Sequence, residues 1–347
     1  MSLSGTYLIR PIRSSDARNL LTLIQKSSGG LSSLQPRLEF LQEYIESSEA
    51  SFAGNIDIDT PHKYLLAMFD GERLIGCAAV KTQIGTGTPF INFDLKGDGL
   101  DQYLEASARF TGATEVGSLF LDSDYRASGL GRYLAKARYL LMASEPWRFS
   151  ETVIAELRGD CGEEGSPLYD HLFKDRLEMD FLEADAEFFD RNPDTIGDIV
   201  PLGRISTQAM PLAVQASIGQ PHISGVSAMR LLQSEGFIFS GTIDLFDAGP
   251  IMSVSRDTIR TIMNSRSSVV SASPASTSGV PTLISLGGVQ DFRAVVSKAK
   301  STENGLLVHT DALQSLNVGD GQDVRFWQGK LKTVRRDIDN TAKAISG

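Results

Sequence analysis

The residues best suited to chemistry form a short, basic, glycine-rich segment that contains Arg126, Gly129 and Gly131. An apolar run at residues 116–121, typical of a strand, precedes this segment, and a helical pattern at residues 133–142 follows it. The first turn of a helix carries backbone N–H groups without intrahelical partners, together with the positive end of the helix dipole. Glycines let the main chain approach an anion closely, and arginines add charge-assisted hydrogen bonds. The order strand, glycine turn, helix therefore predicts a diphosphate cradle.

The cradle is expected to bind its anion through one short stretch of the chain: Arg126, Ser128, Gly129, Leu130, Gly131 and Arg132. An ordinary glycine turn before a helix is the alternative interpretation of the same pattern. The segment has neither the Gly-Lys-Ser/Thr sequence of a P-loop nor the third glycine of a dinucleotide-binding fingerprint, so neither of these motifs describes it.

The composition is that of an ordinary globular protein, with 41% hydrophobic and 22% charged residues in a chain of 347. A chain of this length can form one large domain with an appendage, or two domains. The net charge of −10 leaves no basic surplus to neutralise phosphates over a broad surface. This balance argues against nucleic acid or an anionic membrane as a partner.

The number and spacing of the cysteines and the length of the apolar runs argue against a disulfide-bonded, a metal-binding and a membrane-spanning protein. The two cysteines, Cys77 and Cys161, are far apart and lack Cys-x-x-Cys spacing, so we expect neither a disulfide framework nor a metal site. The first residues show no basic region followed by a long apolar core, and no apolar run approaches the roughly 20 residues of a membrane span. We therefore expect a cytoplasmic protein.

Apolar periodicity predicts the elements that position the cradle. In chain order they are a strand at residues 7–11, helices at 17–26 and 37–47, a hairpin at 63–82, the strand and helix on either side of the cradle, and a strand at 152–157. The hairpin is indicated by Asp70 and Gly71, a turn signal between two apolar runs. Residues 85–99 are glycine-rich and are interpreted as a variable connection. This order predicts an α+β fold with a mixed sheet flanked by helices.

The second half first elaborates this domain. Helical patches broken by prolines occupy residues 180–220, and a helix ended by Gly236 precedes a strand at residues 237–246. We therefore predict that the first domain, with its insertions, covers residues 1–250.

A small β-rich subdomain is predicted over residues 251–347. Residues 267–279 are rich in serine and predict a mobile linker or loop. Short strand candidates separated by glycine and aspartate turns follow at residues 281–286, 292–296, 305–309 and 324–327.

The cradle and the order of the elements resemble the GNAT superfamily of acyl-CoA transferases, with its R/Q-x-x-G-x-G/A signature. Further segments together resemble the arginine N-succinyltransferase family: residues 9–11, 29–34, 118–126, 153–159, 178–181, 218–222, 234–237 and 243–250. They occur in the order of the family. The C-terminal part is similar in length and strand rhythm to the extra β subdomain of that family.

The resemblance implies an enzyme that transfers succinyl from succinyl-CoA to the α-amino group of arginine or ornithine by direct attack, in arginine catabolism. It implies acyl-CoA as a co-substrate and no permanently bound cofactor. Backbone groups of the strand that includes Leu121 would pair with the pantetheine arm, and the Leu119 amide would lie near the thioester oxygen. His222 matches the histidine taken as the catalytic acid or base of the family, a role that suits imidazole. The alternative for His222 is a cap of the helix that begins near Ser224.

Glu156 and Arg158 alternate on one face of a buried-looking strand. Buried charge is costly without a partner, so a site role and a mutual salt bridge are both open. In a site role, Glu156 would bind the cationic amine or guanidinium or help to move its proton, and Arg158 would hold a carboxylate. Ser32 and Ser33 are candidates for substrate contact, with an ordinary serine-glycine loop as the alternative.

One departure from the family pattern concerns the acceptor. Residues 200–206 lack the lysine, histidine and tyrosine that the family tends to carry there, so the identity of the amine is open. Two alternatives follow: a GNAT acyltransferase with a different amine or acyl-CoA, and a non-catalytic subunit that binds acyl-CoA. The expected partners are small-molecule substrates and other chains in a homo- or hetero-oligomer.

Overall fold

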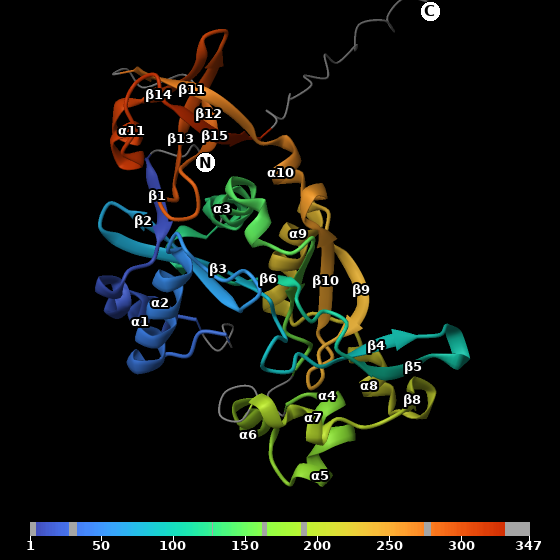
Figure 1. Cartoon of the computed structure of the whole chain (residues 1–347). Helices are drawn as coiled ribbons and strands as arrows, with labels where there is room; N and C mark the ends of the chain where they lie inside the picture. The colour runs from blue at the N-terminus through green and yellow to red at the C-terminus, as the bar shows by residue number, and fades with distance from the viewer. Residues whose placement is uncertain are drawn as a thin grey trace, which may run out of the picture.

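The computed structural model describes residues 5–27, 33–126, 128–161, 165–188, 193–273 and 279–329. Its main sheet consists, in spatial order, of β1 (Tyr7–Pro11), β2 (His62–Asp70), β3 (Arg73–Thr82), β6 (Thr114–Leu121), β7 (Thr152–Glu156), β10 (Pro250–Ser255), β9 (Ile238–Ile243), β4 (Asn92–Lys96), β5 (Tyr103–Ser107) and β8 (Arg204–Ser206) (Figure 1). β6 and β7 are parallel, whereas their neighbours pair antiparallel, so the sheet is mixed.

Helices cover both faces of this sheet (Figure 1). α1 (Ala17–Ile24) and α2 (Leu38–Phe52) pack on the face that includes Leu65, Cys77 and Ala79, which we call the α2 face. α3 (Leu130–Ser144) and α9 (Val226–Glu235) pack on the face that includes Leu66 and Val80, which we call the α3 face. Because successive strand residues point to opposite faces, the continuous apolar runs of β2 and β3 contribute side chains to the hydrophobic cores on both faces of the sheet.

Five short helices cover the part of the sheet around β4 and β9. They are α4 (Pro167–Tyr169), α5 (Asp175–Leu177), α6 (Phe181–Ala186), α7 (Ile196–Ile199) and α8 (Leu212–Ser217), and a π-helical turn, Asp170–Lys174, joins the first two. Their aromatic side chains form one core with Phe93 and Phe246. α6, α7 and α8 lie where helical patches were predicted, between residues 180 and 220, whereas α4 and α5 precede that range.

The C-terminal strands close on themselves. β11 (Arg266–Ser273), β12 (Val280–Leu286), β13 (Arg293–Thr302), β14 (Gly305–His309) and β15 (Asp323–Gln328) form a five-stranded closed sheet, because β12 pairs with both β13 and β15. β13 also pairs with β1, which joins this subdomain to the main sheet, and α11 (Thr310–Leu316) packs against it. α10 (Arg260–Asn264) leads into the subdomain.

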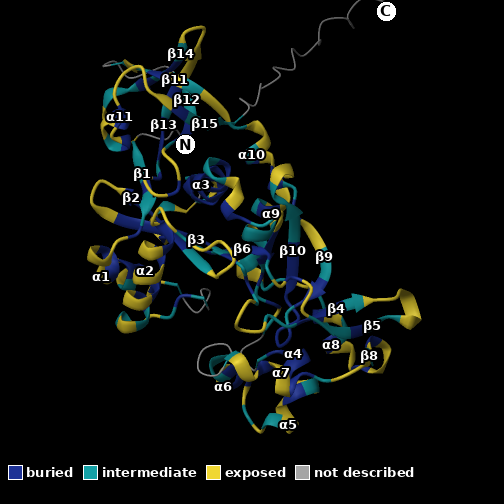
Figure 2. Ribbon diagram, viewed as in Figure 1, coloured by how far each residue is buried: buried dark blue, intermediate teal, exposed yellow. Residues whose placement is uncertain are grey.

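α3 lies between the main sheet and the C-terminal strands and is buried along most of its length (Figure 2). The mixed sheet, the helices on its two faces and the strand-rich C-terminal region confirm the predicted α+β fold class. None of the helices in the described ranges is long and apolar enough to cross a bilayer.

Two local predictions are wrong. Residues 85–99 contain β4, which pairs with β5 and β9 and is not merely a connection. The serine-rich stretch after residue 266 begins with β11, held between β14 and β15, so it is not a linker over that part. The division of the chain after residue 250 stays a prediction.

The pairing of β6 with β7 ends almost at once. Thr114 and Glu115 are the only residues of β6 that pair with β7 within the described chain. On its other side, β6 stays paired with β3 as far as Leu121, with a bulge at Ser118, whose φ is 49°. Residues 117–121 therefore have no strand partner on the side of β7. We call this segment the splay.

Candidate active site

The predicted cradle lies where β6 leads into α3. Gly129 caps the helix with a φ of 86°, a left-handed conformation that side chains disfavour. The Ser128 hydroxyl accepts the backbone N–H of Leu130 at 3.2 Å. A Cβ atom built on Gly131 would meet a methyl of Leu121 at 3.8 Å, an ordinary contact. Backbone conformation therefore explains the glycine at 129, whereas neither conformation nor packing requires the one at 131, where close approach of a ligand is the remaining reason.

Two exposed arginines flank the helix start. Arg126 donates from Nε to the Leu121 carbonyl at 3.3 Å, and its guanidinium lies 5.5 Å from the centre of the Phe120 ring. Neither Arg126 nor Arg132 forms an ion pair with a described residue. Two cations without carboxylate partners, beside the positive end of a helix, favour an anionic ligand.

The loop between α1 and α2 reaches the splay through one of the two predicted serines. The Ser33 hydroxyl lies 2.8 Å from the Ser118 hydroxyl, at the bulge of β6. Ser32 lies outside the described residues.

His222 lies beside the end of β7. Its backbone N–H donates to the Arg158 carbonyl at 2.8 Å, and its Nδ1 accepts the backbone N–H of Ser224 at 3.3 Å. The predicted capping role is therefore confirmed, for the turn Ile223–Gly225. Because Nδ1 is an acceptor, a neutral ring carries its proton on Nε2. Nε2 forms no hydrogen bond with the described residues, so capping leaves it available for proton transfer.

Glu156, the last residue of β7, belongs to a group of carboxyls. Its side chain is hydrogen-bonded to that of Asp244, and burial, with the nearby Asp244 and Glu115, raises the pKa of Glu156 well above its usual value. Burial and Asp244 also raise the pKa of Asp247. Glu115 itself is paired with Lys81 at 3.1 Å. The free-energy cost of burying these neighbouring carboxyl groups decreases when a cation binds beside them.

Arg158 does not pair with Glu156 in the described structure. Its Nε lies 3.3 Å from Asp247 and its Nη1 lies 3.4 Å from Asp185. The mutual salt bridge between Glu156 and Arg158, one of the two predictions for this pair, is therefore wrong. The two side chains have different partners, and the end of β7 holds them on the α2 face beside Asp247.

Asn92, at the start of β4, belongs to the same face. Phe93 pairs with Ile243 and Asp94 with Thr242, so the register continues to Asn92 opposite Asp244. Asn92 is only 2% exposed, and neither atom of its amide group has a hydrogen-bond partner among the described residues. An unsatisfied buried amide is costly, which favours a polar ligand here.

The sequence of this chain matches known proteins over most of its length. The family model described as "Arginine N-succinyltransferase beta subunit" matches residues 7–261, and its C-terminal domain model matches residues 265–328. The chain belongs to the arginine N-succinyltransferase family. The first of these models alone covers most of the chain, including the cradle, the splay and His222.

Individual relatives match over nearly their whole length. A relative from Photorhabdus laumondii named arginine N-succinyltransferase is 31% identical over 92% of this chain and 97% of its own. A relative from Pseudomonas aeruginosa named arginine N-succinyltransferase subunit alpha is 29% identical over 92% and 98%. A solved structure named arginine/ornithine succinyltransferase subunit AI, also from Pseudomonas aeruginosa, superposes with a TM-score of 0.83 at 27% identity, covering 94% and 99%. This member of the arginine N-succinyltransferase family is thus an acyltransferase, and it shares the fold of the solved Pseudomonas aeruginosa structure.

Sequence reasoning missed four side chains of this family member's site region. Asp244 and Asp247 lie in a segment quoted for the resemblance, yet nothing in the sequence places them beside Glu156. Asn92 lies in the stretch interpreted as a connection. Arg138 lies within the predicted helix, and its Nη1 donates to the Gly117 carbonyl in the splay at 3.2 Å.

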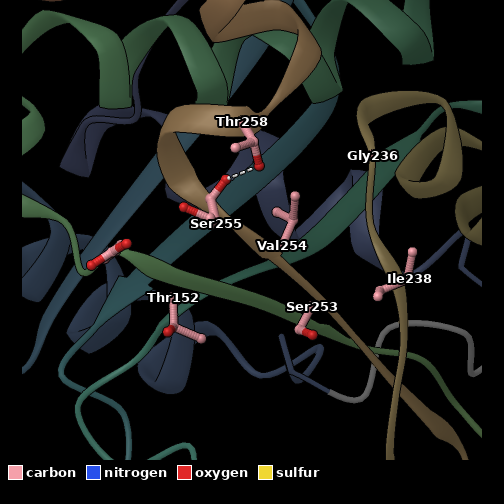
Figure 3. A pocket seen from close by; sticks show the side chains of 8 residues that line it. Thr152, Gly236, Ile238, Ser253, Val254, Ser255 and Thr258 are labelled. Carbon is pink, nitrogen blue, oxygen red and sulfur yellow. Dashed lines mark hydrogen bonds between the residues drawn. The ribbon is translucent and has the colours of Figure 1, made fainter.

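Two surface hollows in the described part of this succinyltransferase-family chain lie away from these residues. One of about 410 Å³ lies over the starts of β7 and β9 and the end of β10, with Thr152, Ser253 and Thr258 in its lining (Figure 3). Another, of about 150 Å³, contains Arg73 and Asp122, which pair with each other. Neither hollow includes a predicted site residue.

Proposed function

We propose that this chain transfers the succinyl group of succinyl-CoA to the α-amino group of arginine, or of ornithine, by direct attack, as a step of arginine catabolism. The names of the relatives support this reaction. The observation that carries it is the splay, because unpaired strand backbone leads directly to a helix start flanked by unpaired arginines. This arrangement suits a carrier with a reactive thioester at one end and a diphosphate at the other.

The donor would lie along β6. The diphosphate would bind the cradle from Arg126 to Arg132, and the pantetheine arm would pair with backbone groups of the splay up to Leu121. The Leu119 amide would donate to the thioester oxygen and stabilise the negative charge that develops there. Acyl-CoA would be a co-substrate, and no permanently bound cofactor is needed.

The acceptor would bind on the α2 face. Glu156 and Asp244 would take the cationic side chain, and the free amide of Asn92 would add a polar contact. Arg158 would contribute to binding the amino-acid carboxylate, and Ser33, with Ser32, would line the approach from the loop before α2.

The chemistry then needs two proton transfers. The neutral amine attacks the thioester carbon, the carbon–sulfur bond breaks, and the attacking nitrogen loses a proton to solvent or to a carboxylate such as that of Glu156. His222 would give the proton on Nε2 to the departing CoA thiolate and regain one from solvent. No covalent enzyme intermediate is required.

We also propose that the protein is cytoplasmic and assembles into a homo- or hetero-oligomer. The Pseudomonas aeruginosa relatives are named as subunits, which supports assembly. Light scattering of the purified chain measures the mass of the assembly. Co-expression with a second copy that bears a different tag, followed by purification through one tag, shows whether the copies associate.

The proposed reaction is tested by incubating the purified chain with succinyl-, acetyl- or glutaryl-CoA and with arginine, ornithine or lysine, and following thiol release. We expect turnover with succinyl-CoA and arginine or ornithine. No turnover with either amino acid would overturn the proposal. Tight CoA binding without turnover would instead support the non-catalytic subunit.

A further inference from the structure

Arg138 is a buried cation at the splay that the reaction described above does not use. It lies on α3 and is 2% exposed. Its Nη1 donates to the Gly117 carbonyl and its Nε to the Ala135 carbonyl, each at 3.2 Å. These carbonyls orient the guanidinium toward the point where β6 separates from β7.

The charge of Arg138 is not neutralised by a described carboxylate. Glu235, the carboxylate that acts on it electrostatically, is already paired with Lys136. Burial lowers the pKa of Arg138. Arg148 is also buried, at 5% exposed, but it pairs with Glu145. A buried charge without a partner is costly, so Arg138 is poised to receive an anion.

The position of that anion follows from the strand. Gly117, whose carbonyl Arg138 contacts, is two residues from Leu119. Two residues of a regular strand span about 6.6 Å, which is the upper limit here because β6 has its bulge at Ser118. An acyl chain that starts at the Leu119 amide and runs toward Gly117 ends beside the guanidinium after a few carbon atoms. A four-carbon chain with a carboxylate at its far end fits this distance.

The charges on the two faces of the sheet also separate the two substrates. The carboxyls of Glu156, Asp244 and Glu115 lie on the α2 face, whereas Arg138 approaches from the α3 face. A cationic acceptor is therefore attracted to one side of the splay and an anionic acyl group to the other. Each face repels the wrong substrate.

We infer that Arg138 binds the free carboxylate of the succinyl group and selects a dicarboxylic acyl-CoA over a neutral one. This inference rests on the proposed function, which places the thioester at Leu119. The matched neutral donor is butyryl-CoA, in which a methyl replaces the carboxylate.

The test compares succinyl-CoA with butyryl-CoA, both by calorimetric binding and by kcat/KM with arginine. For the wild type we expect a preference for succinyl-CoA of about 100-fold or more. In Arg138→Met the preference should fall by about 100-fold, because affinity and kcat/KM decrease for succinyl-CoA but not for butyryl-CoA. Arg138→Lys keeps the charge but loses the planar guanidinium, so its preference for succinyl-CoA should lie between those of the wild type and Arg138→Met. Arg148→Met, a buried arginine outside the site, should leave the ratio unchanged.

Equal losses for the two donors in Arg138→Met, or equal affinity of the wild type for both, would overturn the inference. If Arg138→Met does not fold, Arg138→Lys and the wild-type affinities still decide the matter. Binding is measured without an acceptor, so a failure of arginine transfer leaves this test intact. Preferential binding of succinyl-CoA that is lost in the Arg138 variants would support the inference even then.

Discussion

At the scale of single residues, His222 combines two roles in one ring: Nδ1 caps a turn, and Nε2 is free to carry a proton. His309 provides a natural comparison, because its Nδ1 accepts the Asp311 N–H at 3.3 Å and caps α11 in the same way. The capping role alone therefore cannot make the two histidines differ in catalysis.

We predict that His222→Ala lowers kcat by about 100- to 10,000-fold, because the leaving thiolate loses its proton donor. His309→Ala should cost a similar amount of stability, about 1 kcal/mol for a lost cap, and leave kcat unchanged. Steady-state kinetics and thermal unfolding of both variants measure this. Equal kcat values for the two variants would mean that His222 only caps the turn.

Glu156 links stability to pH. Its pKa in the folded protein is raised above the usual value of 4.5, chiefly by burial. The contribution of the protonated carboxyl is therefore fully present below that usual value and is lost as the pH rises through the folded pKa. Glu156→Gln stays neutral, so without substrate it should become more stable than the wild type as the pH increases.

Thermal unfolding of Glu156→Gln and of the wild type between pH 5 and pH 9 measures this difference in stability. In steady-state kinetics, the KM of Glu156→Gln for arginine should rise because a carboxylate is lost. Glu151→Gln, an exposed change just before β7, is the control and should follow the wild type at every pH. A difference between Glu156→Gln and wild type that does not grow with pH would contradict the buried carboxyl group described here.

At the scale of elements, the sequence predicts structure well where local signals and tertiary context agree. β2 and β3 follow from their apolar runs around Asp70 and Gly71, and the end of α9 follows from Gly236, whose φ is 107°. The cradle is predictable for the same reason, because strand, turn and helix are contiguous in the chain.

Elements held by distant partners could not be predicted in this way. β11 has a single fully buried residue, Val270, and is a strand because β14 and β15 pair with it. Likewise, the bond from His222 to the Arg158 carbonyl and the register that places Asn92 opposite Asp244 join segments far apart in the sequence. The strand, turn and helix of the predicted cradle were thus foreseen, whereas most of the contacts on the proposed acceptor side were not.

The start of α3 gives a prediction for the cradle. Gly131 has ordinary backbone angles and space for a Cβ, so Gly131→Ala should not reduce stability. It should weaken CoA binding by about 10-fold, because the methyl obstructs a diphosphate held against the first turn. Gly197→Ala is a matched control, since Gly197 is also the second residue of a helix with a methyl at 3.8 Å. Calorimetry with CoA should separate the two, and unchanged affinity in Gly131→Ala would argue against the cradle.

At the scale of the whole molecule, a buried ion pair joins the main sheet to the C-terminal subdomain. Lys136 of α3 pairs with Glu235 of α9, donates to the Thr261 hydroxyl at 2.8 Å and lies 4.0 Å from the ring centre of Trp327 in β15. α3 therefore begins at the predicted cradle and, further along, contacts the C-terminal strands.

We predict that Lys136→Met lowers the free energy of unfolding by about 3 kcal/mol, because the buried Glu235 loses its cationic partner and keeps the neutral donors of Thr261. Adding Glu235→Leu should restore most of this loss. Lys174→Met, which removes an exposed pair with Asp170, should change stability by less than about 0.5 kcal/mol. Chemical denaturation measures all three, and a Lys136→Met variant as stable as the wild type would contradict the junction described here.

The central claim is that the splay of β6 and the start of α3 together hold the acyl carrier. A crystal structure of the protein with CoA and arginine tests it most directly. We expect the diphosphate at the N-terminus of α3, the pantetheine arm along residues 119–121, and arginine on the α2 face near Glu156. CoA bound elsewhere, for example in the hollow over β9 and β10, would contradict the account.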